Sequence, residues 1–213
     1  FKEVQQPLNV LRANLYVAMF NPSKDVDYED IIVPLQQIRD ALVSKYHNLY
    51  LKDLDMFIDK VKIFKTHFAT IDIRQDHSMH TKVMHAVLLK NGFIKEELSE
   101  LSETALIDIL LHQKLELKAD DYTEDIVKDT IKNVSQLSDI QKKNGEHGCN
   151  RYIISNSEDV FSILYVYALF RWCGWADRDI TFDIVPLFET MRGMDDAEAT
   201  MQQLFKLKEY RSH

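Results

Sequence analysis

Glycine and proline are scarce in this sequence, which has five glycines and four prolines among 213 residues. Average usage is about 7% for glycine and about 5% for proline, so the chain has few of the residues that form turns. Few turns favour long helices over many short strands. The length suits one domain, or a large part of one, with enough bulk to bury a hydrophobic core.

An excess of positive charge is also missing, because 26 Lys and Arg residues stand against 34 Asp and Glu and the net charge is −8. A protein that binds nucleic acid without sequence preference needs a basic face to neutralise phosphates. The longest largely apolar run, residues 161–170, is about half the roughly 20 residues of a membrane-spanning helix. We therefore expect a protein that binds neither nucleic acid nor a membrane.

Cysteine is nearly absent, and several common motifs are missing altogether. Cys149 and Cys173 are not spaced as a CxxC or CxxH pair, so we expect reduced, partly buried thiols in a cytoplasmic protein. The sequence has no GxGxxG or Walker phosphate loop and no GxSxG nucleophile motif.

Hydrophobic residues recur at helical spacing in four segments, residues 31–46, 51–64, 123–141 and 157–173. Pro34 fits the first of these helices only near its first turn or at a kink. The last segment is apolar on nearly all sides, which predicts a buried helix. We expect Asn156 or Ser157 to cap it and Gly174 to end it in a left-handed conformation.

Three shorter segments are rich in β-branched and aromatic residues, and each precedes a polar cluster and a helix. They cover about residues 68–74, 150–155 and 180–188. Repeated strand–loop–helix units are typical of a parallel sheet or an α/β barrel, so the predicted fold class is α/β with helices dominating. In this interpretation residues 1–66 form a helical region, and residues 67–213 hold the strands and the helices between them.

Two charged residues stand near predicted strand ends, where the functional side chains of α/β barrels gather. Arg74 suits a phosphate or carboxylate, and Glu189 suits a hard cation such as Mg²⁺. Together they suggest chemistry on a phosphorylated acid, although such residues are more often solvated or paired with another charge. His77, His80 and His85 lie close in sequence, but without a Cys or Glu-x-x-His pattern they favour capping and surface roles over metal binding.

Three sequence motifs lie in these segments: TIDIRQDHSMHT (residues 70–81), YIISNSEDV (residues 152–160) and VPLFET (residues 185–190). Together they resemble motifs of the phosphoenolpyruvate carboxylase family. TIDIRQDHSMHT (residues 70–81) resembles D-(V/I)-R-Q-(D/E)-x-x-x-H-T, and VPLFET (residues 185–190) matches V-P-L-F-E-T. YIISNSEDV (residues 152–160) is similar to Y-(V/I)-I-S-M-A-x-x-x-S-D-V-L, with Asn156 and Ser157 where the family usually has Met and Ala. Three motifs in the family's order are much more specific than any one of them. The departure in the second motif indicates a divergent, bacterial-type member.

The resemblance implies an internal segment of the enzyme, with three of the eight strands of a TIM-like (β/α) barrel and many additional helices. The family's T-A-H-P-T-E, G-(Y/F)-S-D and F-H-G-R-G-G segments have no counterpart in the chain. We therefore expect the isolated segment to be inactive. The alternative to a carboxylase segment is a non-catalytic helical interaction or scaffold domain that retains the barrel strands.

The resemblance also implies an activity, partners and site residues. Family members use Mg²⁺ or Mn²⁺ to carboxylate phosphoenolpyruvate with bicarbonate, which yields oxaloacetate and phosphate in an anaplerotic fixation of carbon. They are cytoplasmic homotetramers. By motif position, Glu189 would be one of two metal carboxylates, and Arg74 would face the phosphoryl group or bicarbonate. Asp72 and His80 match family positions as well, in supporting or capping roles.

Overall fold

The computed structural model describes residues 1–21, 23–175 and 180–213. These residues fall into two compact units. The first unit comprises residues 1–70 and 139–148, and the second comprises residues 71–138 and 149–213.

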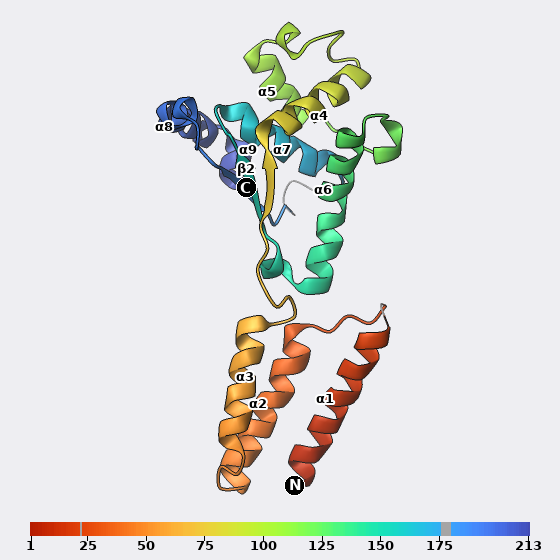
Figure 1. Ribbon diagram of the computed structural model, residues 1–213, viewed down its shortest axis with the longest axis vertical. Helices are drawn as coiled ribbons and strands as arrows, with labels where there is room; N and C mark the ends of the chain where they lie inside the picture. Colours follow the sequence, from red (N-terminus) through yellow and green to blue (C-terminus); the bar gives the residue numbers. More distant parts are fainter. Residues whose placement is uncertain (22, 176–179) are drawn as a thin grey trace. The chain divides into compact units, whose positions relative to one another are not determined.

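Three helices form most of the first unit: α1 (Lys2–Phe20), α2 (Tyr28–Lys45) and α3 (Leu51–Phe64) (Figure 1). Their shared core consists of Leu11, Ile32, Leu35 and Ile58, each at most 5% exposed. This core takes one or two apolar positions from each helix, as expected for amphipathic helices that bury one stripe.

The helix α2 begins earlier than the periodicity predicts. Asp27 and Asp30 form a capping box, in which each side chain accepts a hydrogen bond from the other residue's backbone N–H. Pro34 therefore lies inside the helix rather than in its first turn. Because proline has no N–H, α2 lacks one of its backbone hydrogen bonds at this point.

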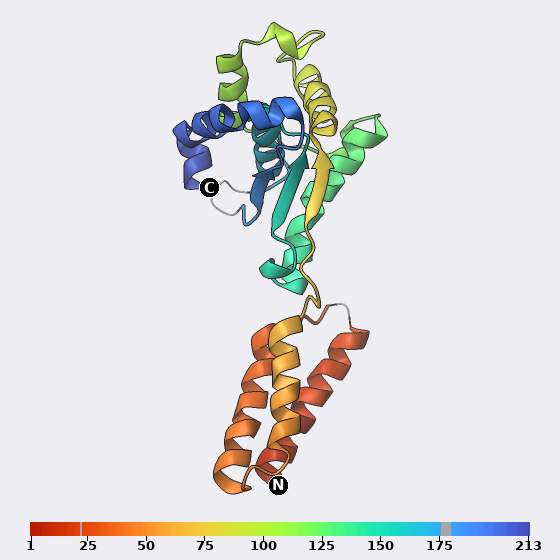
Figure 2. The same ribbon diagram turned by 60° about the vertical axis from the view of Figure 1, so that its left-hand side comes forward.

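The second unit is built on a parallel sheet of three strands in the order β1–β2–β3 (Figure 2). The strands are β1 (Ile73–Asp76), β2 (Arg151–Ser155) and β3 (Asp183–Pro186). The helices are α4 (His77–Lys90), α5 (Glu103–His112), α6 (Asp125–Asn144), α7 (Val160–Trp172), α8 (Met191–Lys206) and α9 (Lys208–Ser212). Of α6, the residues up to Ser138 belong to this unit and the remainder to the first. The described residues thus form a helix-dominated α/β fold with three parallel strands, as the sequence predicts.

The two faces of the sheet differ in burial. Tyr152 and Ile154 of β2 lie on the face covered by α4 and α7, and they are 3% and 0% exposed. The Tyr152 ring packs edge-on against Phe170 of α7, with ring centroids 5.7 Å apart. Because side chains alternate along a strand, Arg74 and its register partner Ile153 point to the opposite, less buried face.

The first strand lies further along the chain than predicted. The sequence indicates a strand over residues 68–74, whereas β1 starts at Ile73. Phe68 has a φ of 63°, outside the β region, and its ring stacks on Phe64. Phe68 and Ile71 are also largely exposed. Apolar residues before β1 therefore suggested a strand that they do not form. The strand β3 is likewise shorter than the predicted residues 180–188.

The ends of α7 are decided by two residues. Asp159, rather than Asn156 or Ser157, caps the helix by accepting hydrogen bonds from the backbone N–H groups of residues 161 and 162 at 3.0 and 3.1 Å. Gly174 follows the helix with a φ of 98°, the predicted left-handed conformation. The helix between them is buried, as its apolar sequence predicts.

The expectations of reduced cysteines and of no membrane-spanning helix can be compared with the described residues. Cys149 and Cys173 form no disulfide there. Within the same parts of the chain, no helix combines the length and the apolar character needed to cross a bilayer.

We expect Phe170→Ala to lower the free energy of unfolding of the second unit by about 3–5 kcal/mol, because Phe170 is 0% exposed and its removal leaves a cavity. Denaturant unfolding followed by tryptophan fluorescence measures this, since Trp172 and Trp175 both belong to the second unit. Phe205→Ala is the control, because Phe205 is 55% exposed and its loss should cost under about 1 kcal/mol. Equal effects of the two substitutions would contradict the core described here.

Candidate functional site

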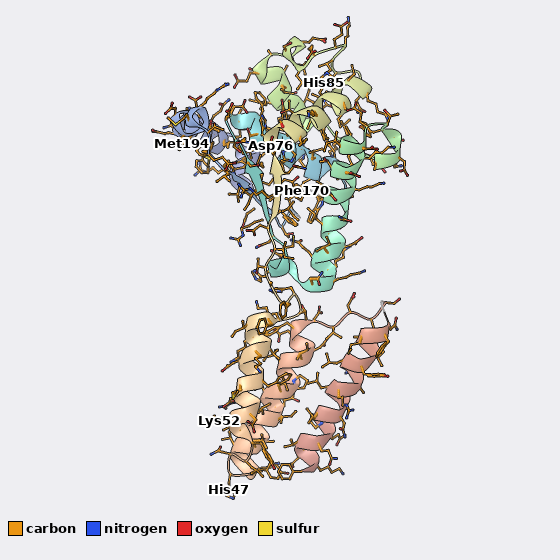
Figure 3. All side chains as sticks on the ribbon, in the orientation of Figure 1. His47, Lys52, Asp76, His85, Phe170 and Met194 are labelled. Carbon is orange, nitrogen blue, oxygen red and sulfur yellow. The ribbon has the colours of Figure 1, made fainter. Side chains whose placement is uncertain are left out.

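The carboxyl-terminal edge of the sheet gathers polar residues from three separate segments. β1 ends at Asp76, where α4 begins at the next residue (Figure 3). β2 ends at Ser155 and is followed by Asn156, and β3 is followed by a loop that contains Glu189. Because the strands are parallel, all three ends lie at the same edge, where ligands of α/β folds usually bind.

Glu189 is held by two donors at this edge. Arg74 Nη2 donates to Glu189 Oε2 at 3.4 Å, and the backbone N–H of Asn156 donates to Glu189 Oε1 at 3.2 Å. The Arg74 and Glu189 side chains are 57% and 39% exposed, so water screens this ion pair and it adds little to stability. The sequence predicts both residues at one edge, and the structure brings them into contact. Arg74 lies within β1, however, two residues before its end.

Asp76, for which the sequence predicts no role, belongs to the same cluster. Its Oδ1 accepts the backbone N–H of Ser78 at 2.8 Å and thereby caps α4, and its Oδ2 accepts Asn156 Nδ2 at 2.5 Å. Hydrogen bonds from Ser78 and from Asn156 lower the pKa of the Asp76 carboxyl below its ordinary value. An aspartate immediately before a helical segment is a capping signal, which could have identified half of this role.

The turn between β2 and α7 supports the loop that carries Glu189. Ser157 N–H donates to Leu187 O at 3.2 Å, and Thr190 Oγ1 donates to Glu158 Oε1 at 3.1 Å. A Cβ atom on Gly193 would lie 2.4 Å from Ser157 O, so the two backbones approach more closely than any other residue allows. These contacts give the Glu189 loop a defined position against the end of β2.

The residues present fit a divalent cation only as a partial site. No group of three or more His, Cys, Asp or Glu side chains among residues 1–21, 23–175 and 180–213 is arranged to hold a metal ion. Mg²⁺ commonly takes only one or two protein carboxylates and completes its shell with water and substrate oxygens. Glu189 is partly exposed and fits the role of one such carboxylate.

Comparison with known proteins adds to this geometry. The family model of phosphoenolpyruvate carboxylase matches residues 7–213. The chain belongs to the phosphoenolpyruvate carboxylase family. It is 28% identical over 191 residues to the phosphoenolpyruvate carboxylase of Gloeobacter violaceus, an alignment that covers 86% of the chain and 20% of that protein. It is 32% identical over 180 residues to the enzyme of Thermosynechococcus vestitus, which covers 79% of the chain and 17% of that protein.

These alignments cover most of the chain but only a small part of each relative. The chain spans about a fifth of the length of the curated phosphoenolpyruvate carboxylases that it matches. The modest identities agree with the divergent member expected from the second sequence motif.

Asp72, which also matches a carboxylase motif, lies away from the cluster around Glu189. It precedes β1, and its Oδ1 pairs with Nε of Arg151, the first residue of β2, at 2.9 Å. This ion pair therefore connects the amino-terminal ends of two strands, at the edge opposite to Glu189. The structure does not bring Asp72 and Glu189 together.

His80, the other matching position, is a core residue. Its ring is 0% exposed, and its Nε2 lies 3.0 Å from the hydroxyl of Tyr152, on the helix-covered face of the sheet. Burial lowers the pKa of His80 to about 4, which keeps the imidazole neutral at pH 7. Its position therefore agrees with a role in packing α4 against β2.

The buried His80 predicts a loss of stability in mild acid. Its pKa is about 4 in the folded protein and about 6.5 when unfolded, so between these values the unfolded chain binds the additional proton. The free energy of unfolding should therefore be fully retained above pH 6.5 and fall by roughly 3 kcal/mol towards pH 4.

The His80→Gln variant keeps a hydrogen-bonding group near Tyr152 but cannot titrate. Its unfolding free energy should change less between pH 7 and pH 4 than that of the wild type, measured by denaturant titration at each pH. His77 remains in both proteins, and burial lowers its pKa as well, so the difference between the curves isolates His80. An identical pH dependence of the unfolding free energy in wild type and His80→Gln would contradict this assignment. The matched control is His147→Gln, at an exposed position, which should keep the pH dependence of the wild type.

Proposed function

We propose that the chain is a segment of an active phosphoenolpyruvate carboxylase, which joins bicarbonate to phosphoenolpyruvate and releases oxaloacetate and phosphate. The observation that carries this proposal is the contact between Arg74 and Glu189. The two residues come from two different family motifs and meet at the carboxyl-terminal edge of a parallel sheet. The parent protein is proposed to act in the cytoplasm as a homotetramer, as the family resemblance implies.

Arg74 is proposed to bind the anionic substrate. Its guanidinium group stays charged at every physiological pH and presents several N–H donors in one plane, which suits phosphoryl or bicarbonate oxygens. More than half of the side chain is exposed, so these donors are accessible. Arg74 would hold the substrate's phosphoryl group in place and offset the negative charge of its oxygens.

Glu189 is proposed as one ligand of Mg²⁺ or Mn²⁺. When bound, such a cation stabilises negative charge that develops on the oxygen atoms of the substrate. Glu189 has a hydrogen bond from Asn156 on one oxygen and from Arg74 on the other, and this orients its carboxylate plane at the end of β3. A carboxylate held in this way needs less reorganisation to bind a cation.

The sheet is proposed to be part of an eight-stranded (β/α) barrel. In such barrels helices cover the outside of the strands, and inward side chains from neighbouring strands fill the interior. The helices α4 and α7 cover one face of the sheet, and Arg74, Ile153 and Val185 share the register on the other face. The outer edges of β1 and β3 would pair with the remaining strands of the parent protein.

In the full-length protein, Glu189→Gln should lower the rate of oxaloacetate formation on the order of 100-fold, because the amide removes a negative ligand without changing size. Malate dehydrogenase reports the product when phosphoenolpyruvate, bicarbonate and Mg²⁺ are supplied. Glu116→Gln is the matched control, since the Glu116 side chain is 82% exposed and should not affect the rate. An active Glu189→Gln variant would remove Glu189 from the site. An inactive wild type would favour the non-catalytic scaffold instead.

Residues 1–213 alone should form no oxaloacetate in the same assay. They supply Arg74 and Glu189 for the proposed roles, whereas the proposed reaction requires a second metal carboxylate and further cationic groups. The contrary outcome is measurable turnover by residues 1–213 that Glu189→Gln lowers at least as strongly as in the full-length protein. That result would overturn the proposal that the site is shared with the rest of the protein.

A further inference from the structure

We propose that Asn156 is a positioning residue that ties the Glu189 carboxylate to Asp76 across the end of β2. This inference rests on the proposed function, in which Glu189 is a metal ligand. It concerns the position at which the chain departs from the family motif, where the family usually has methionine.

The backbone of Asn156 makes the first half of the tie. Asn156 directly follows β2 and has a φ of 55°, in the left-handed region that asparagine adopts more readily than most residues. In this conformation its N–H donates to Glu189 Oε1 at 3.2 Å. The end of β2 therefore determines where one oxygen of the Glu189 carboxylate is held.

The side chain of Asn156 makes the second half. Its Nδ2 donates to Asp76 Oδ2 at 2.5 Å, and the other Asp76 oxygen accepts the N–H of Ser78 in the first turn of α4. A hydrogen bond to an ionised carboxylate is shorter and stronger than one between neutral groups. Hydrogen bonds thus run without a break from α4 through Asp76 and Asn156 to Glu189.

This arrangement requires a side chain that donates a hydrogen bond to Asp76, which asparagine supplies. A glycine would satisfy the left-handed backbone equally well, so the backbone alone does not require a side chain at this position. A methionine thioether cannot donate a hydrogen bond to Asp76. The side-chain amide of Asn156 binds Asp76 and its backbone N–H binds Glu189, so this one residue contacts both carboxylates. Partners of metal ligands orient a site in a similar way.

The affinity for Mn²⁺ tests directly whether the hydrogen bond from Asn156 to Asp76 positions the Glu189 carboxylate. Mn²⁺ alone is titrated into the full-length protein without substrates, and electron paramagnetic resonance measures the free ion. Asn156→Gly keeps the backbone conformation but removes the bond to Asp76, so we expect the Mn²⁺ Kd to rise roughly tenfold. In the carboxylase assay, the KM for Mn²⁺ should rise more than kcat falls.

Asn48→Gly is the matched control. Asn48 is exposed in the first unit, and its φ of 63° makes the backbone consequence of the substitution similar. Its Mn²⁺ Kd should equal that of the wild type. Tryptophan fluorescence of Asn156→Gly should also be unchanged, because Trp172 and Trp175 lie in the unit that holds the sheet.

A double-variant cycle asks whether Asn156 acts through Asp76. Asp76→Ser retains a hydroxyl that can cap α4 but is too short to reach the Asn156 amide, which removes this hydrogen bond. Adding Asn156→Gly to Asp76→Ser should then change the Mn²⁺ Kd less than about twofold, because the interaction is already lost. A further tenfold loss in the double variant would overturn the tie through Asp76.

The outcomes separate this inference from the function on which it rests. Loss of Mn²⁺ binding in Glu189→Gln together with wild-type binding in Asn156→Gly would overturn the role of Asn156 and leave the metal role of Glu189 standing. Wild-type binding in Glu189→Gln would overturn the metal role and the inference with it. Weakened binding in both variants, with an unchanged Asn48→Gly control, would support both.

Discussion

The parallel pairing of β1, β2 and β3 is the constraint on which the candidate site depends. Arg74 and Glu189 are 115 residues apart in sequence, and Asp76 and Asn156 are 80 apart, yet each pair is in contact. A parallel sheet requires each strand to run in the same direction, so helices must return the chain between strands. The same requirement places all three strand ends, and the polar residues that follow them, at one edge.

Alternation of side chains along the strands gives the two faces of the sheet different functions. One face carries Tyr152, which packs against Phe170 and His80 and is buried by α4 and α7. That packing stabilises the second unit and excludes water from its core. The other face carries Arg74, whose side chain is 57% exposed, so its charge remains in contact with water. The buried face of the sheet therefore stabilises the unit, and the opposite face carries Arg74, which has a proposed chemical role.

Sequence patterns predicted the bounds of α3 better than those of β1. A helix such as α3 repeats its apolar stripe over several turns, and its bounds agree with the predicted residues 51–64. β1 has only four residues, too few for an alternating pattern to be distinguished from apolar residues beside it. Phe68 and Ile71 consequently moved the predicted strand away from its position. The cap of α7 was misassigned for a similar reason, since Asn156, Ser157 and Asp159 are all common capping residues.

The sequence by itself determined the family and the helix-dominated α/β class, and it predicted Arg74 and Glu189 as candidate site residues at one edge of the sheet, because motifs and periodicity are local properties of the chain. Tertiary structure alone decided that these two side chains touch, that Asp72 lies at the opposite edge and that His80 is buried. It also revealed the link from Asp76 through Asn156 to Glu189. The physical reason is that hydrogen bonds between strand ends depend on register and backbone conformation, which form only when distant segments pair.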